Sequence, residues 1–245
     1  MSFYIKKTMI NSLLETKYIL IQELEFMEII MSNTTDQKTI TINGNPGNPT
    51  GEAGKQMLER MNQSHYEVTG WALDFFEIKD GFTILDIGCG GGMTLKRLSA
   101  LSPSGILFGI DHSSVAVEES IKLNETLCKS GKIKISKASV ESLPFASSSF
   151  DRIITVESFY FWPNPVENLK EVLRVLKAGG KFMLVADIYG KEGLSEETLE
   201  NIKLFNLLNP TKQEFFEMFE KSGFMNIDIH IKEGTDWIAV IGTKK

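Results

Sequence analysis

The sequence feature that most constrains the fold is a short apolar run that ends beside an acid and breaks into glycines, Ile84-Leu-Asp-Ile-Gly-Cys-Gly-Gly-Gly92. Such a run predicts a buried strand, a tight turn and the start of a helix. In an open α/β sheet this turn lies at the carboxyl edge, where ligands bind. Glycines let the backbone come closer to a ligand than a Cβ would allow. The run therefore predicts a ligand site at the first turn of an α/β domain.

Stretches of strand and helix character alternate along the rest of the chain. Short apolar runs predict strands over 83–87, 105–110, 132–137, 150–156, 180–188, 225–232 and 237–243. Helices are expected over 55–62, 66–76, 93–101, 114–130, 166–176, 196–208 and 212–222. This alternation favours an α/β fold, a mostly parallel sheet with helices on both faces. The short connection 233–236 predicts a terminal hairpin, which makes one strand antiparallel.

The N-terminal part differs in composition from the rest, so we expect an extension and linker over 1–53 and a domain over 54–245. Apolar residues in the first thirty positions fit an amphipathic helix loosely, but charged residues interrupt them too often for a signal peptide or a membrane span. Two interpretations stay open: a helix that faces a partner, or translation from a wrongly assigned start. Residues 54–78 are expected to form a helical lid.

The composition of the chain limits the kinds of partner that we expect for it. The chain has a net charge of -6 and a pI of about 5.3, so a nucleic acid is not expected, because phosphate binding needs a clustered basic surface. Cys89 and Cys128 exclude a disulfide framework and favour a reducing cytoplasm. No cysteine or histidine stands at metal-ligand spacing with another, so no metal site is expected. The oligomeric state is not readable.

Two acids indicate which ligand the edge of the sheet holds. Asp86 precedes the glycines, where an anion disfavours a pyrophosphate and suits a cationic ligand, and Asp111 ends the second strand, where it could accept both hydroxyls of a ribose. A dinucleotide fingerprint would also place a glycine at Met93. This edge therefore offers an acid for an ammonium group, backbone without side chains, and an acid for a ribose. Such a site fits S-adenosylmethionine better than a dinucleotide.

Five motifs in order then resemble those of a known family. They are Ile84 to Gly92, Gly109-Ile-Asp-His-Ser113, Leu143-Pro-Phe145, Ser149-Phe-Asp151 and Arg174-Val-Leu-Lys-Ala-Gly-Gly180. The chain from Gly54 onward resembles the class I S-adenosylmethionine-dependent methyltransferases, and more narrowly the type 11 group that includes quinone-biosynthesis C-methyltransferases. The resemblance implies a Rossmann-like, seven-stranded sheet in the order 3-2-1-4-5-7-6 with strand 7 antiparallel.

Carried over position by position, the resemblance also implies a cofactor site. The methionine part would be lined by Asp86, Gly88, Cys89 and Gly90. Asp111 would hold the ribose and His112 would border the adenine, while Glu157 would face the cofactor or the substrate. Family members often carry an Asp beside the adenine, where this chain has Ser139, so Ser139 or the Val140 backbone is expected to make that contact. Cys89 itself is expected to be a small packing residue.

The resemblance implies methyl transfer to a small-molecule acceptor by in-line displacement at the sulfonium methyl. Such a reaction needs alignment and exclusion of water, and a base only when the acceptor arrives protonated. His65 is the best candidate for that base, with Glu157 and Tyr160 as further catalytic candidates. Tyr160 and Trp162 are expected to line the acceptor pocket.

The sequence predicts a packing role for three other residues, Phe159, Phe161 and His230. Two other functions stay open for the chain as a whole. One is a non-catalytic S-adenosylmethionine-binding scaffold. The other is a nicotinamide-dependent oxidoreductase, which Asp86, Met93 and the lack of a Tyr-x-x-x-Lys pair disfavour.

Overall fold

A computed structural model describes residues 37–245. The expected amphipathic helix within residues 1–30 lies outside these described residues. The compact unit that contains the sheet runs from Gly44 to Lys245, so it begins before the expected boundary at Gly54. Among the described residues, no helix has both the length and the apolar character needed to cross a bilayer.

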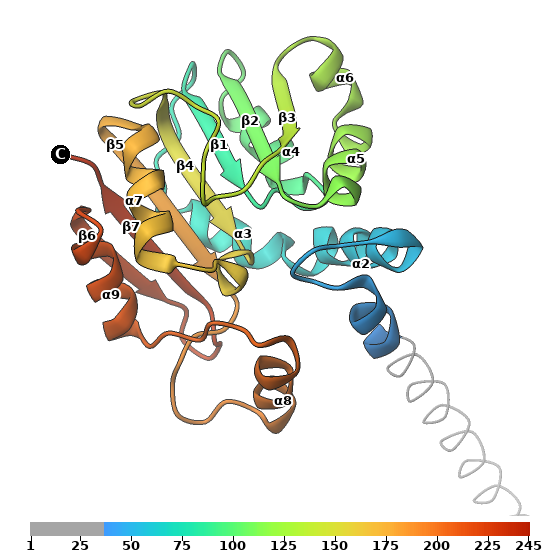
Figure 1. Cartoon of the computed structure of the whole chain (residues 1–245). Coiled ribbons are helices and arrows are strands. Elements are labelled where there is room, and N and C mark those ends of the chain that lie inside the picture. Colours follow the sequence, from blue (N-terminus) through green and yellow to red (C-terminus); the bar gives the residue numbers. More distant parts are fainter. Residues whose placement is uncertain (1–36) are drawn as a thin grey trace, which may run out of the picture. The chain divides into compact units, whose positions relative to one another are not determined.

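Seven strands form one sheet with the order β3-β2-β1-β4-β5-β7-β6 (Figure 1). The strands are β1 (Thr83–Ile87), β2 (Ile106–Asp111), β3 (Ile133–Lys137), β4 (Phe150–Val156), β5 (Leu176–Ala186), β6 (Met225–Ile231) and β7 (Ile238–Thr243). Strand β7 pairs antiparallel with both β5 and β6, and the other neighbouring strands are parallel. The expected order and the antiparallel strand 7 are confirmed.

In the part of the chain that the structure describes, six helices contact strands of the sheet: α3 (Tyr66–Leu73), α4 (Met93–Leu101), α5 (Ser114–Leu123), α6 (Glu125–Lys129), α7 (Pro165–Val175) and α9 (Lys212–Lys221). Helix α2 (Gly51–Ser64) packs against α3 and α5, and α8 (Glu196–Phe205) lies away from the sheet (Figure 1). Local signals set the ends of several helices. Helix α7 begins with Pro165, whose fixed φ suits a first helical position. Helix α9 begins with a capping box between Thr211 and Glu214.

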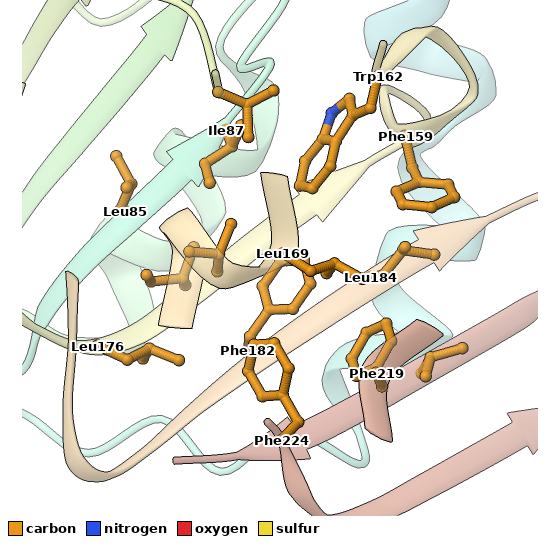
Figure 2. Close-up of a cluster of buried hydrophobic side chains, with 14 of the residues drawn as sticks. Leu85, Ile87, Phe159, Trp162, Leu169, Leu176, Phe182, Leu184, Phe219 and Phe224 are labelled. Atoms are coloured by element: carbon orange, nitrogen blue, oxygen red, sulfur yellow. The ribbon is translucent and has the colours of Figure 1, made fainter. Parts of the chain in front are cut away.

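Alternate residues of the strands build two apolar cores. One core lies between the sheet and helices α7 and α9, and aromatic rings fill much of it (Figure 2). Phe182 of β5 stacks there on Phe219 of α9, with ring centroids 5.6 Å apart. The second core joins the opposite face to α3 and α4 through residues such as Ala72 and Leu98. Strand β1 is buried on both faces, which explains its nearly continuous apolar sequence.

Two elements differ from the sequence prediction. The single helix expected over 114–130 is interrupted at Asn124, whose side-chain amide donates to the carbonyls of Gly92 and Ser120. The sequence prediction ends a helix at residue 176 and begins the next strand at residue 180, which leaves Lys177 to Gly179 as a connection. It lies instead inside β5, where the register with β4 shifts and Gly179 takes a φ of 73°.

The stretch before α2 also differs from the expected linker. Pro49 is buried, and its carbonyl accepts a hydrogen bond from the Ser113 hydroxyl, which also caps α5. The Cα of Gly47 lies so close to the Phe161 ring that a Cβ would come within 2.8 Å of it. These contacts make residues 46–49 part of the packed unit.

We expect Phe182→Ala to destabilise the protein by about 3–5 kcal/mol, because the ring is fully buried and its removal leaves a cavity among the other rings. Phe216→Ala is the matched control, since Phe216 lies on α9 and is 38% exposed. Urea denaturation followed by circular dichroism gives both values. Equal midpoints for the two variants would contradict the assigned core.

Candidate functional site

One cavity of about 430 Å³ lies at the carboxyl edge of the sheet. This volume is within the range of ~300–1,000 Å³ that is usual for small-molecule sites. Its walls come from the glycine turn after β1, the ends of β2 and β4, helices α2 and α3, and residues 46–49. The expected lid, residues 54–78, contributes Leu58, Met61, Asn62, His65, Tyr66 and Thr69 to these walls.

The glycine turn is held tightly against neighbouring elements. Gly88 has a φ of 71°, and a Cβ on it would lie 2.4 Å from the side chain of Ser158. The N–H groups of Gly88 and Cys89 both donate to the carbonyl of Ile110 at the end of β2. Glycine at position 88 is therefore required both by the backbone conformation and by the lack of space. The turn presents bare backbone to the cavity.

Asp111 lies in the cavity wall at the end of β2, as predicted. Its Oδ2 accepts from the N–H of Gly90 at 3.0 Å, and its Oδ1 accepts from the N–H of Ser113 at 2.9 Å. Burial raises the pKa of this carboxyl, and the two N–H donors partly oppose that effect. Each oxygen keeps a second lone pair, so Asp111 can still accept hydroxyl groups from a ligand.

Asp86 does not line the cavity, although the sequence placed it against the ligand. Its side chain is 1% exposed and lies beneath the glycine turn, and its Oδ2 has no hydrogen-bond partner among the described residues. Burial, reinforced by the nearby Asp111 carboxylate, raises the pKa of Asp86 to about 8. Asp86 can therefore act on a ligand through the turn that it supports, but not by direct contact in this conformation.

Cys89 has the packing role expected of its side chain. Its backbone borders the cavity, while the sulfur is buried against Ser120, with Sγ and Oγ 3.8 Å apart. Burial raises the pKa of the thiol well above its ordinary value, so the group stays protonated. A nucleophilic role does not fit this environment.

The end of the cavity assigned to adenine contains the expected residues. His112, Ser139 and Val140 all line it, together with Gly90 of the glycine turn. The Ser139 hydroxyl is already engaged with Glu141, through an Oγ to Oε2 hydrogen bond of 3.2 Å and a backbone bond from the Glu141 N–H. Sequence reasoning missed Glu141, which also lines the cavity and supplies a carboxylate close to the position where the family often has its Asp.

At the other end of the cavity, the aromatic residues after β4 are placed differently from the prediction. Trp162 lines the cavity as expected, and Phe161, which was expected to be loop packing, lines it as well. Tyr160 was expected in the wall but is buried behind it. The short 3-10 turn over Phe159–Phe161 points successive side chains in different directions, which the sequence alone does not reveal. His230 stacks on Phe75 with centroids 3.9 Å apart, as a packing residue would.

A polar cluster of Glu157, Tyr160 and Asp187 lies at this end of the cavity, where β4 and β5 end. The Tyr160 hydroxyl is 3.0 Å from Oε2 of Glu157 and 2.9 Å from Oδ1 of Asp187. The same hydroxyl oxygen accepts from the N–H groups of Asp187 and Ile188. Glu157 has a φ of 55°, a left-handed conformation that an L-residue rarely adopts. The residues packed around Glu157 therefore hold its backbone in this strained conformation.

Burial also sets the charge states of the cluster. It raises the pKa of Glu157 well above the ordinary value, and the Asp187 carboxylate adds to that shift. Burial lowers the pKa of His65, an effect that Asp187 opposes and Arg60 reinforces. His65 and Glu157 both line the cavity, so an imidazole with a lowered pKa and a carboxyl with a raised pKa face the same space.

Three other polar residues complete the site: sequence reasoning missed Asp187 and Arg97, and it placed Asn62 in the expected lid. Asp187 follows β5, and its position at the carboxyl end of a strand was the signal that could have identified it. Asn62 donates to the carbonyl of Gly91, which ties α2 to the glycine turn. Arg97 of α4 lines the cavity, donates to the carbonyl of Tyr66 and lies 4.0 Å from the centre of that ring.

Comparison with known proteins gives a consistent result. A family model of a methyltransferase domain matches residues 85–184. A rice 2-methyl-6-phytyl-1,4-hydroquinone methyltransferase is 26% identical over 79% of this chain, which spans only about half of that protein (52%). An uncharacterised methyltransferase of Bacillus subtilis, YdaC, is 26% identical over 76% of this chain and 94% of its own length.

Solved structures share the fold. A Haemonchus contortus phosphoethanolamine N-methyltransferase, determined with S-adenosylhomocysteine, superimposes with a TM-score of 0.68 at 15% identity. The match covers 79% of this chain and 58% of that protein. A likeness at this level of identity concerns the fold, including the order of the strands.

The buried carboxyl of Asp86 predicts a pH-dependent difference in stability. The folded protein holds this proton up to a pH of about 8, whereas the unfolded chain releases it near the ordinary value of 3.8. The stabilisation is therefore complete below pH 3.8 and is lost as the pH rises towards 8. We expect Asp86→Asn to gain stability relative to the parent protein by up to about 1.4 kcal/mol per pH unit over that range.

Denaturation at pH 5, 6, 7 and 8 measures this difference. Asp228→Asn is the control, because Asp228 is an exposed carboxylate on β6. A difference between Asp86→Asn and the parent protein that stays constant with pH would contradict a proton held on Asp86.

Proposed function

We propose that this chain, as a member of the class I S-adenosylmethionine-dependent methyltransferases of the type 11 group, methylates a small-molecule acceptor. The observation that carries the proposal is one continuous cavity that joins the glycine turn and Asp111 to His65, Glu157 and Trp162. A cofactor and an acceptor can therefore lie end to end in the same enclosed space.

The described residues fit S-adenosylmethionine at the glycine end. Gly88 and Gly90 leave backbone open to the methionine part, and Asp111 keeps free lone pairs for ribose hydroxyls. The orphan Oδ2 of Asp86 lies in a region where positive charge is favourable, because a cationic ligand stabilises a buried carboxylate. When bound, the cofactor supplies a methyl group on a sulfonium. The thioether that remains is a good leaving group and needs no further activation.

The protein's contribution is then to align the acceptor and to exclude water. Phe161 and Trp162 give the acceptor end apolar walls, which favour an aromatic or otherwise apolar acceptor. The hydroquinone acceptor named for the rice relative has this chemistry. The lowered pKa of His65 leaves its imidazole neutral at pH 7, so it can accept a proton from an acceptor hydroxyl or amine.

The two alternative functions have less support. No finding favours a nicotinamide cofactor, and the family is one of methyltransferases. A non-catalytic binding protein would need no acceptor pocket, whereas this cavity extends beyond the glycine turn. Both cysteines are free, which is consistent with the reducing cytoplasm that we propose as its location.

We expect S-adenosylmethionine to bind the purified protein with a micromolar dissociation constant. Asp111→Ala should weaken binding by roughly 10–100-fold, because hydrogen bonds to a charged group contribute about 1.5–3 kcal/mol. Isothermal calorimetry measures both values, with Asp228→Ala as a control on an exposed acid. No heat of binding from folded parent protein would overturn the proposed cofactor.

We expect transfer of labelled methyl groups from the cofactor to an apolar or aromatic component of fractionated metabolites, identified by mass spectrometry. With that acceptor, His65→Ala should lower turnover most strongly towards the lower pH values between pH 6 and 9, where fewer acceptor molecules are already deprotonated. Unchanged turnover across this range would show that His65 is not the base.

A further inference from the structure

The polar cluster behind the acceptor end has the composition of a metal site. His65 lies at the end of α2, Glu157 follows β4 and Asp187 follows β5. One nitrogen or oxygen from each of these three side chains lies within 4.8 Å of the other two. Three different elements therefore bring an imidazole and two carboxylates to one point, on the wall of the cavity.

One of these groups lacks a partner that buried polar atoms normally have. Oε1 of Glu157 is buried and has no hydrogen-bond partner among the described residues. His65 lines the cavity beside it, so its imidazole is open to a ligand that also binds Glu157. Buried polar atoms are rarely left without partners, so such a ligand would remove an energetic cost.

The hydrogen bonds of Tyr160 show that the cluster also lacks positive charge. Its hydroxyl has one proton, yet two carboxylate oxygens lie within 3.0 Å of it. Its two lone pairs are already used by the N–H groups of Asp187 and Ile188. One proton cannot satisfy both carboxylates, so the pair is stable only when it holds an added proton or another cation.

We propose that His65, Glu157 and Asp187 bind one divalent transition-metal ion of the Mn²⁺, Fe²⁺ and Zn²⁺ class. One imidazole and two carboxylates are the mixed nitrogen and oxygen donors that these ions accept, whereas Mg²⁺ and Ca²⁺ prefer oxygen alone. Tyr160 holds the two carboxylates in orientation, as the hydrogen-bonded partners of metal ligands commonly do. The proposal stands independently of the proposed methyl transfer.

Binding requires at most a small closure of the cluster. Donor atoms at ~2.0–2.2 Å from one ion lie about 3–3.5 Å apart when adjacent, and the three donor atoms here all lie within 4.8 Å of one another. His65 lies on the lid and the two carboxylates lie on the sheet, so the ion would draw the lid onto the sheet edge. The ion would also occupy the lone pair of His65, and in the metal-bound protein His65 no longer serves as a base.

The test is metal binding by the full-length protein after treatment with a chelator, in the absence of cofactor. Loss of the free Mn²⁺ signal in electron paramagnetic resonance and calorimetry with Zn²⁺ both give stoichiometry and affinity. We expect one ion per chain. Glu157→Gln and Asp187→Asn should each weaken binding by at least the ~10–100-fold that loss of an outer-shell partner costs.

Controls separate this site from other metal-binding groups. Asp228→Asn removes the carboxylate of a second histidine–carboxylate pair, in which His230 Nε2 and Asp228 Oδ2 are 2.9 Å apart, and it should leave affinity unchanged. Circular dichroism confirms that each variant is folded. If either acidic variant is unfolded, Tyr160→Phe replaces it in the test, because this variant keeps all three donors and removes only the hydroxyl that orients the two carboxylates. Absence of stoichiometric binding, or binding that neither acidic variant weakens, would overturn the proposal.

Discussion

The structure depends on how tightly the glycine turn after β1 is enclosed. The end of β2 takes its N–H groups, Asn62 and Asn124 bond to its carbonyls, and Ser158 fills the space where a side chain at position 88 would stand. Each contact comes from a different element. The turn therefore fixes the relative positions of α2, α5 and the ends of β2 and β4, which together build most of the cavity.

Buried acids are the second constraint. Asp86, Asp111 and Glu157 lie along the same sheet edge, and burial raises the pKa of all three. Neutral residues at these positions would give a more stable protein, because desolvation of a carboxylate is costly. Their combined effect is an edge that favours cations, at the glycine end for a sulfonium cofactor and at the other end for a metal ion.

The sequence predicted the framework well because local patterns determine it. Strands β1 and β4 and helix α4 have the predicted bounds, since apolar runs and glycines mark their ends. The strand order came from the family resemblance. The positions that differ depend on contacts distant in sequence: Asn124 interrupts a helix to reach Gly92, and Tyr160 turns inward to meet Asp187. A single sequence contains no local signal for such contacts.

The strip at residues 46–49 has a consequence for how the protein is made. Pro49 packs on Ser113 and Gly47 on Phe161, so this segment contacts parts of the cavity wall that are encoded much later in the chain. During synthesis this segment leaves the ribosome long before its partners exist. Contacts between distant parts of a chain form late, because the loop between them must first be closed. The pocket is therefore among the last features to be completed as the nascent chain folds.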